Sequence, residues 1–336
     1  MGDIKIVEFA PNWEQKHEDF AKAYWPNKRR RYIPEYIYWK FRGIEGNNLP
    51  SFALAIDDNK VIGQFGFIPC DININGNVHP AQWICDLLVS INYRGKGVAK
   101  LLYKFIEKNG RLSLGSDPSP SCQKSLLRSG YALISGPNKW IYPISIGGTL
   151  MLKSKSFRYF RWVKNPVLFY LNKKYKENLD SFISVNKTEI IKKYHLPRKE
   201  CNIPYVVHDD LFLKWRCNKF KHYYSGIKII ESLHNNSYVC FMRASDAVYI
   251  TDYHYENISD LATILLMAGE YGKREKLSFI KVLSNSDKDD LAFSKLLLIK
   301  MRTPTKIIIK NSSFSSNKIN LGNKFFYTLM DSDSNI

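Results

Sequence analysis

Short apolar runs separated by turn-forming residues dominate the early part of the chain. Residues 52–56 and 61–69 are two such runs on either side of Asp57-Asp58-Asn59-Lys60, and a second turn at 75–77 leads into a third run that ends at Val89. Asp, Asn and Gly tolerate the backbone angles of tight turns, and apolar runs of this length are typical of buried strands. The pattern predicts three consecutive antiparallel strands.

Apolar residues with helical spacing lie before and after these strands. They predict a helix over Glu8–Tyr24, a short aromatic-rich helix around Trp39, and an amphipathic helix that begins at Val98. A strand at 113–116 and a helix over Cys122–Ser129 follow. This order predicts an α/β (α+β) fold with a mixed, mostly antiparallel sheet flanked by helices.

The second half of the chain repeats parts of the first. Phe212-Leu213-Lys214-Trp215-Arg216 matches Tyr36-Ile37-Tyr38-Trp39-Lys40 at an offset of 215 − 39 = 176 residues, and the same offset places a turn at 234–236 on the first turn of the early strands. Tyr249-Ile250-Thr251-Asp252 likewise matches Trp83-Ile84-Cys85-Asp86. Three matches in the same order indicate an internal duplication.

The duplication predicts how the chain divides. We expect a first domain at 1–148, a helical linker at 149–200 and a second domain at 201–336. A length of 336 residues agrees with about two domains. Aromatic and basic residues alternate at 154–176, which fits either base stacking or amphipathic helices packed on their aromatic faces, and we favour the helices.

Composition narrows the class of protein. No apolar run reaches the ~18 residues of a membrane span, and the first residues lack a signal-peptide pattern. The six cysteines are isolated, without a C-x-x-C pair, so we expect neither a metal site nor a disulfide framework. These features predict a cytoplasmic protein without a membrane span.

The net charge of +19 has three interpretations. It fits a polyanionic partner such as RNA, a solvated lysine-rich surface, or small anions such as the diphosphates of coenzyme A and a nucleotide. We favour the last two together and expect no nucleic-acid partner. The basic run at 28–31 is either a phosphate contact or a solvated loop.

One stretch has the properties of an anion-binding loop. The strand that ends at Val89 is followed by Arg94-Gly95-Lys96-Gly97-Val98-Ala99 and then by the amphipathic helix. Gly95 and Gly97 allow positive φ and a close approach to a ligand, and amides at a helix N-terminus bind anions. The stretch is suited to a diphosphate, although it matches neither G-x-x-x-x-G-K-[ST] nor G-x-G-x-x-G.

Arg94, Gly97 and Ala99 fill the pattern [QR]-x-x-G-x-[GA], which resembles motif A of the GNAT superfamily of acyl-CoA N-acyltransferases. The resemblance implies acyl-CoA as cosubstrate and no metal. It assigns the pantetheine arm to Leu87, Leu88 and Val89. It assigns the diphosphate to the loop residues Arg94, Gly95, Lys96, Gly97, Val98, Ala99 and Lys100. The second copy has no glycine pair after Asp252, so we expect two GNAT-like domains of which the second is degenerate.

The resemblance also implies direct attack of an amine on the thioester, without a covalent intermediate. A carboxylate or histidine could take the proton of the amine, and our candidates are Asp86 first, then Asp117 and His79. The counterpart Asp252 weakens the case for Asp86, because the second copy lacks the loop. Leu126 stands where many members carry a tyrosine that protonates the thiolate, so we expect another proton source or solvent.

The acceptor is inferred from a second, more diffuse resemblance. Nearly the whole chain is similar to tandem-GNAT enzymes that acylate dTDP-3-amino-3,6-dideoxyhexoses for surface polysaccharides such as O-antigen or capsule. This implies a nucleotide-linked amino sugar as acceptor and a second domain that shapes its cleft. Two alternatives are an aminoacyl-tRNA-dependent transferase of the peptidoglycan-bridge type, which needs no such loop, and a non-catalytic RNA-binding protein.

Overall fold

We analysed a computed structural model of the chain. It describes residues 3–42, 49–145, 147, 150, 173–184, 204–209, 211–212, 215–216, 227–284, 286–310 and 325. The segment at 154–172, for which we favour helices, lies outside these residues. Most of the linker expected at 149–200 does so as well.

The chain forms two compact units, each assembled from separate stretches. The first unit contains 1–135, 202–215 and 306–324, and the second contains 136–201, 216–305 and 325–336. This division differs from the consecutive ranges expected from the sequence.

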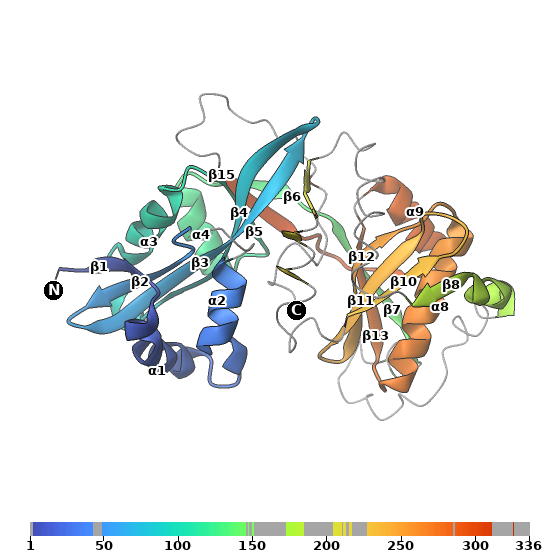
Figure 1. The fold of residues 1–336 in the computed structure, drawn as a ribbon, viewed down its shortest axis with the longest axis horizontal. Coiled ribbons are helices and arrows are strands. Elements are labelled where there is room, and N and C mark those ends of the chain that lie inside the picture. Colours follow the sequence, from blue (N-terminus) through green and yellow to red (C-terminus); the bar gives the residue numbers. More distant parts are fainter. Residues whose placement is uncertain are drawn as a thin grey trace. The chain divides into compact units, whose positions relative to one another are not determined.

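The first unit is built on an 8-stranded sheet (Figure 1). Its strands are β1 (Lys5–Glu8), β2 (Phe52–Asp57), β3 (Lys60–Ile74), β4 (Asn77–Val89), β5 (Leu112–Ser116), β15 (Lys306–Lys310) and β6 (Ala132–Ser135) in spatial order, with β9 (Tyr205–Val206) paired to β3. The pair β4–β5 is parallel, and the other pairs are antiparallel.

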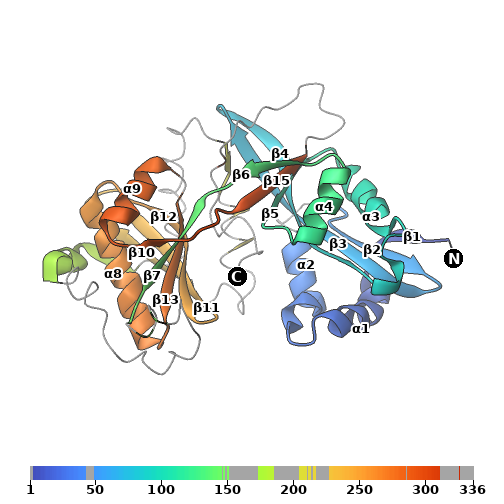
Figure 2. The same cartoon turned by 180° about the vertical axis from the view of Figure 1, so that it is seen from behind.

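Helices cover both faces of this sheet (Figures 1 and 2). Helices α1 (Glu14–Tyr24) and α2 (Pro34–Arg42) pack on one face with Leu54 and Ile56. Helix α3 (Val98–Glu107) packs on the other with Ala53 and Ala55, and Leu126 of α4 (Pro120–Arg128) joins the same core. Because side chains alternate along a strand, β2 supplies both cores and is buried throughout.

The second unit is built on a 7-stranded sheet. Its strands in spatial order are β8 (Phe182–Ser184), β10 (Lys228–Ser232), β11 (Tyr238–Ala244), β12 (Ala247–His254), β13 (Phe279–Ser284), β7 (Asn138–Pro143) and β14 (Ile299–Lys300). Only β12–β13 is parallel among these pairs. Helices α8 (Ile258–Arg274) and α9 (Asp287–Lys295) share one core with the sheet.

Apart from β9, the strands of the two sheets correspond in order. Reading outward from the parallel pair, the order β5–β15–β6 of the first unit corresponds to β13–β7–β14 of the second. Strand β7 directly follows β6 in the sequence but pairs with β13, while β15 follows β14 but pairs with β5. Each sheet therefore contains one strand that follows the other copy in the sequence, and we call β7 and β15 the exchanged strands. This exchange explains why the units are discontinuous.

The N-terminal prediction was wrong in part. Lys5–Glu8 forms β1 at the sheet edge, Pro11–Trp13 forms a 3-10 turn, and the helix begins at Glu14 rather than Glu8. The apolar spacing of a four-residue edge strand is too short to be separated from that of the following helix. Further 3-10 turns lie at Arg29–Arg31, Ile91–Tyr93 and Lys176–Ser181.

Candidate functional site

The glycine turn lies at the N-terminus of α3 with the backbone angles expected for it. Gly95 has φ +78° and Gly97 has φ +83°, and a Cβ at either position would meet no atom within 4 Å. The glycines therefore serve the backbone conformation and leave the space beside it open. The Leu101 amide donates the first helical bond to the Gly97 carbonyl at 3.2 Å, so the preceding amides have no acceptor in the helix.

No side chain caps this end of α3, and its first turn has no acidic residue. Arg94, Lys96 and Lys100 are exposed around the loop. Free amides, the helix dipole and these cations together favour a bound anion.

Hydrogen bonds attach the loop to the rest of the first unit. The Ser90 amide donates to the Ile62 carbonyl at 2.8 Å, and the Ile91 amide donates to the Tyr24 hydroxyl at 3.0 Å. The Tyr93 hydroxyl donates to Asp57 at 2.8 Å. The loop is thus fixed before any ligand binds, which lowers the entropy cost of binding.

Strands β4 and β5 separate next to this loop. Their register covers only Ala81–Trp83 of β4 and Leu112–Leu114 of β5, whereas β4 continues to Val89, paired with β3. In the described pairings, the β5-facing edge of β4 beyond Trp83 has no ladder partner. Leu87, Leu88 and Val89, the residues expected at the pantetheine arm, lie on this edge segment.

Asp86 lies at a bulge in β4, where the register with β3 shifts between Gln64 and Gly66. Its φ of +55° is in the left-handed region, which costs a non-glycine residue ~1–3 kcal/mol unless neighbours hold it. Lys40 Nζ donates to Asp86 Oδ2 at 2.8 Å, and Arg31 pairs with Oδ1 at 3.5 Å. Both carboxylate oxygens of the first candidate base therefore face cations.

The Asp86 main chain is held as well. Gln64 Nε2 donates to the Asp86 carbonyl at 3.2 Å, and Gln64 Oε1 bonds His17 Nε2 at 2.9 Å. His17 Nδ1 is buried without a partner among the described residues. Burial lowers the pKa of His17 to about 4, against the smaller effects of Gln64 and Asp86. At neutral pH the imidazole is uncharged, and its Nε2–H donates to Gln64.

The other two candidate bases have surroundings different from those of Asp86. Asp117 lies after β5, where its Oδ1 accepts the Lys306 amide at 3.0 Å and its own amide donates to the Lys306 carbonyl at 2.8 Å, so it fastens the exchanged strand β15. His79 is seven residues before Asp86 on β4, or ~23 Å along an extended strand.

The position of the missing tyrosine supplies no proton, since Leu126 is buried in the core of the first unit. Sequence reasoning overlooked Tyr103, which donates from α3 to Ser125 of α4 at 3.0 Å. Burial raises the pKa of Tyr103 to about 12, so this phenol remains protonated at neutral pH. Burial also raises the pKa of the Cys122 thiol to about 11.

In the second unit, the N-terminus of the corresponding helix, α8, is capped by side chains. The Asn257 side chain caps α8 by accepting the Asp260 amide at 3.0 Å, and the Asp260 carboxylate accepts bonds from Asn235, Ser237 and Asn257. A carboxylate on the first turn takes the place that an anion would occupy. This contrast agrees with the prediction that only the first copy has a diphosphate loop.

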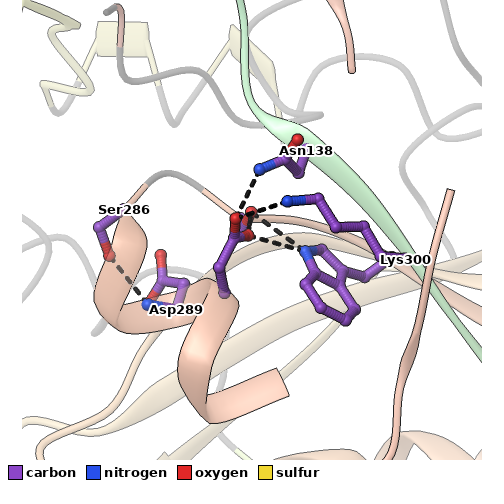
Figure 3. Close-up of polar contacts among 7 residues, drawn as sticks. Asn138, Ser286, Asp289 and Lys300 are labelled. Atoms are coloured by element: carbon purple, nitrogen blue, oxygen red, sulfur yellow. Dashed lines mark hydrogen bonds and ion pairs between the residues drawn. The ribbon is translucent and has the colours of Figure 1, made fainter. Parts of the chain in front are cut away.

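A polar cluster holds the exchanged strand in the second unit (Figure 3). Asp290 accepts from Trp140 at 2.9 Å, Asn138 at 2.6 Å and Lys300 at 3.0 Å, and also from Ser284. Although burial opposes its charge, these donors lower the pKa of Asp290. The cluster therefore joins β7, β13, β14 and α9.

A hollow of about 200 Å³ lies within the second unit, where β12 and β13 separate. Its lining combines aliphatic, aromatic and basic side chains: Lys139, Trp140, Ile141, Tyr249, Lys281, Val282, Leu283 and Met301. Lys281 Nζ donates to the Tyr249 hydroxyl at 3.1 Å.

Among the residues that the structure describes, no three His, Cys, Asp or Glu side chains gather in a way that could hold a metal ion. None of the described helices has the length and apolar character needed to cross a membrane.

In comparisons with known proteins, part of the first unit matches a family model. Residues 13–109 match the family model described as an acetyltransferase (GNAT) domain. The comparison with curated proteins gives no significant match.

Solved structures resemble almost the whole chain. A GCN5-related N-acetyltransferase from Kribbella flavida has a TM-score of 0.63 at 10% identity over 92% of this chain and 72% of its own. A probable N-acyltransferase from Enterococcus faecalis has a TM-score of 0.59 at 12% identity, over 93% of this chain and 73% of its own. An N-myristoyltransferase from Saccharomyces cerevisiae with bound myristoyl-CoA has a TM-score of 0.60 at 11% identity, over 93% of this chain and 79% of its own.

At these identities, the structural likeness concerns the fold, and the family match adds the chemistry of its domain. Together with the glycine loop on α3, they support an acyl-CoA N-acyltransferase. The first unit is therefore similar to a GNAT acetyltransferase domain over residues 13–109.

Proposed function

We propose that the chain transfers an acyl group from acyl-CoA to the amine of a nucleotide-linked amino sugar, of the dTDP-3-amino-3,6-dideoxyhexose type, for surface polysaccharide synthesis. The main support is the pairing of an uncapped helix end at Gly97 with the adjacent separation of β4 from β5. The amino-sugar acceptor is inferred from the sequence resemblance alone. Because acyl-CoA and nucleotide sugars are cytoplasmic metabolites, the proposal places the reaction in the cytoplasm.

In the proposed complex, the amides at the start of α3 bind the coenzyme diphosphate, and Arg94, Lys96 and Lys100 add positive charge. The pantetheine arm follows the open edge of β4 along Leu87, Leu88 and Val89. An N–H of this segment polarises the thioester carbonyl, an interaction typically worth roughly 3–4 kcal/mol in the transition state.

The amine then attacks the thioester carbon, the C–N bond forms, and the C–S bond breaks to release coenzyme A thiolate. The amine proton passes to solvent or a nearby base, and the thiolate takes up a proton. Holding amine and thioester at attack distance supplies much of the remaining acceleration. We assign the second unit to the acceptor, because its own helix end at Asn257 is capped.

Thiol release tests the proposal. Purified protein should release free thiol when acyl-CoAs of increasing chain length are combined with dTDP-amino sugars, and calorimetry should detect coenzyme A binding. Coenzyme A binding without thiol release for any amino sugar would reject the proposed acceptor, while the acyl-CoA site would still be supported. Absence of coenzyme A binding would reject the proposal and favour the tRNA-dependent or RNA-binding alternatives, which predict an RNA affinity that falls steeply with salt.

A further inference from the structure

The left-handed residue Asp86 directly precedes the strand segment to which the proposed function assigns the thioester. Three side chains from other elements hold it: Lys40 from α2 and Arg31 contact its carboxylate, and Gln64 from β3 contacts its carbonyl. Aspartate tolerates left-handed φ better than most residues, but within a strand this conformation needs support from its surroundings. The conformation of this segment therefore depends on residues outside β4.

We propose that Lys40 and Gln64 are positioning residues, which hold the main chain of Asp86 at the β4 bulge and thereby orient the amides of the Leu87–Val89 segment toward the thioester. Asp86 is then the anchor of this segment and not the general base. This inference rests on the proposed function for its catalytic consequence, but the conformational part stands on the contacts alone.

Burial supports an anchoring role for the ion pair. Lys40 is 4% exposed, and the Asp86 side chain is 9% exposed. A buried ammonium needs its counter-charge, so the pair constrains both groups strongly. Because Lys40 and Arg31 engage different carboxylate oxygens, proton uptake by Asp86 would disrupt at least one of these contacts.

The duplication distinguishes the contribution of the Lys40–Asp86 ion pair from that of Gln64. In the second unit, Arg216 and Asp252 stand at the positions equivalent to Lys40 and Asp86, both are buried, and the register again shifts between Cys240 and Phe241. A basic and an acidic residue are thus retained where the anion loop is lost, which argues against a role that depends on that loop. The positive φ itself is found at Asp86 and not at Asp252.

Gln64 differs from the ion pair in this respect. The offset of 176 residues places Cys240 at its equivalent position. The bridge from His17 through Gln64 to the Asp86 carbonyl is therefore specific to the unit with the loop. This restriction agrees with a contribution of Gln64 to the site itself.

The ion pair is tested with Lys40→Met, Asp86→Asn and the double variant. Asparagine also tolerates left-handed φ, so the double variant removes both charges without burying one of them unpaired. We expect each single change to lower kcat about tenfold or more, with the KM for acyl-CoA within about twofold, because the diphosphate loop is separate. The double variant should recover part of kcat relative to Asp86→Asn. A double variant as slow as Asp86→Asn, with the acidic limb of the pH profile lost, would identify Asp86 as the base and overturn the proposal.

Hydrogen exchange tests the conformational part without an acceptor. Lys40→Met and Gln64→Met should both raise amide exchange in a peptide covering 84–89. Lys310→Met is the matched control, because it breaks the ion pair of Lys310 with Glu107 at 2.8 Å in the same unit. It should leave exchange at 84–89 unchanged. Equal protection in all variants would reject the anchor even if thiol release is observed, whereas raised exchange without thiol release would reject only the proposed reaction.

Discussion

The indoles of Trp39 and Trp215 each donate a hydrogen bond to the main-chain carbonyl of the other residue, at 3.1 and 2.8 Å. The two rings lie 5.5 Å apart, and both residues are buried. They are also the residues that the 176-residue offset places at equivalent positions. The two Trp residues therefore contact each other reciprocally within the first unit.

This contact predicts a symmetric loss of stability. Trp39→Phe and Trp215→Phe each remove one indole N–H together with the buried hydrogen bond that it donates, which costs about 1–3 kcal/mol. We expect losses of this size from either change in urea unfolding. Trp13→Phe, at a half-exposed indole in the same unit, is the control. Losses no larger than in the control would show that the reciprocal bonds contribute nothing.

Two glycines with the same backbone conformation separate ligand binding from strain. Gly97 has φ +83° and Gly76 in the β3–β4 hairpin has φ +87°, and neither position has an atom within 4 Å of a built Cβ. Gly97→Glu and Gly76→Glu should cost similar stability. Only Gly97→Glu should weaken coenzyme A binding, by roughly 30- to 100-fold in calorimetry, or ~2–3 kcal/mol. Equal affinities of the two variants would place the coenzyme elsewhere.

His17 predicts a specific loss of stability in mild acid. Its pKa falls from 6.5 to about 4 on folding, so between these values the unfolded chain binds more protons than the folded one. Stability from this group is therefore complete above pH 6.5 and decreases as the pH falls toward 4, by ~3 kcal/mol in total. Urea unfolding at pH 7, 5.5 and 4.5 should show that the free energy of unfolding depends less on pH in His17→Gln than in the wild type. An equal pH dependence in the two proteins would contradict the lowered pKa of His17.

Asp290 should stabilise the second unit through the exchanged strand. Asp290→Asn removes the ion pair with Lys300 and weakens three further bonds, and we expect a loss of about 2–3 kcal/mol. Asp287→Asn, in the first turn of the same helix, controls for the helix dipole. Because the pKa of Asp290 is lowered, the difference between wild type and Asp290→Asn should shrink as the pH falls below 3.8. A difference that is constant with pH would exclude the charged cluster as its cause.

Much of the candidate site could be predicted from local sequence. The glycines at 95 and 97, the amphipathic residues of α3 and the apolar run before Val89 specify strand, turn and helix through local backbone preferences. These preferences act within a few residues, so they are visible in the sequence. The edge strand β1 was missed because four residues carry too little periodicity, and its pairing with β2 decides its conformation.

The sequence by itself indicated the duplication, the order of strands and helices from β2 to α4, and the loss of the glycine loop in the second copy. Only the tertiary structure decided that β7 and β15 exchange sheets, and that Lys40, Gln64 and Arg31 meet at Asp86. Strand pairs and ion pairs join residues that are far apart in the sequence, as between Glu107 and Lys310, 203 positions apart. Such pairings depend on which surfaces remain to be buried after the local elements form. A short stretch of the sequence therefore does not specify its distant partner.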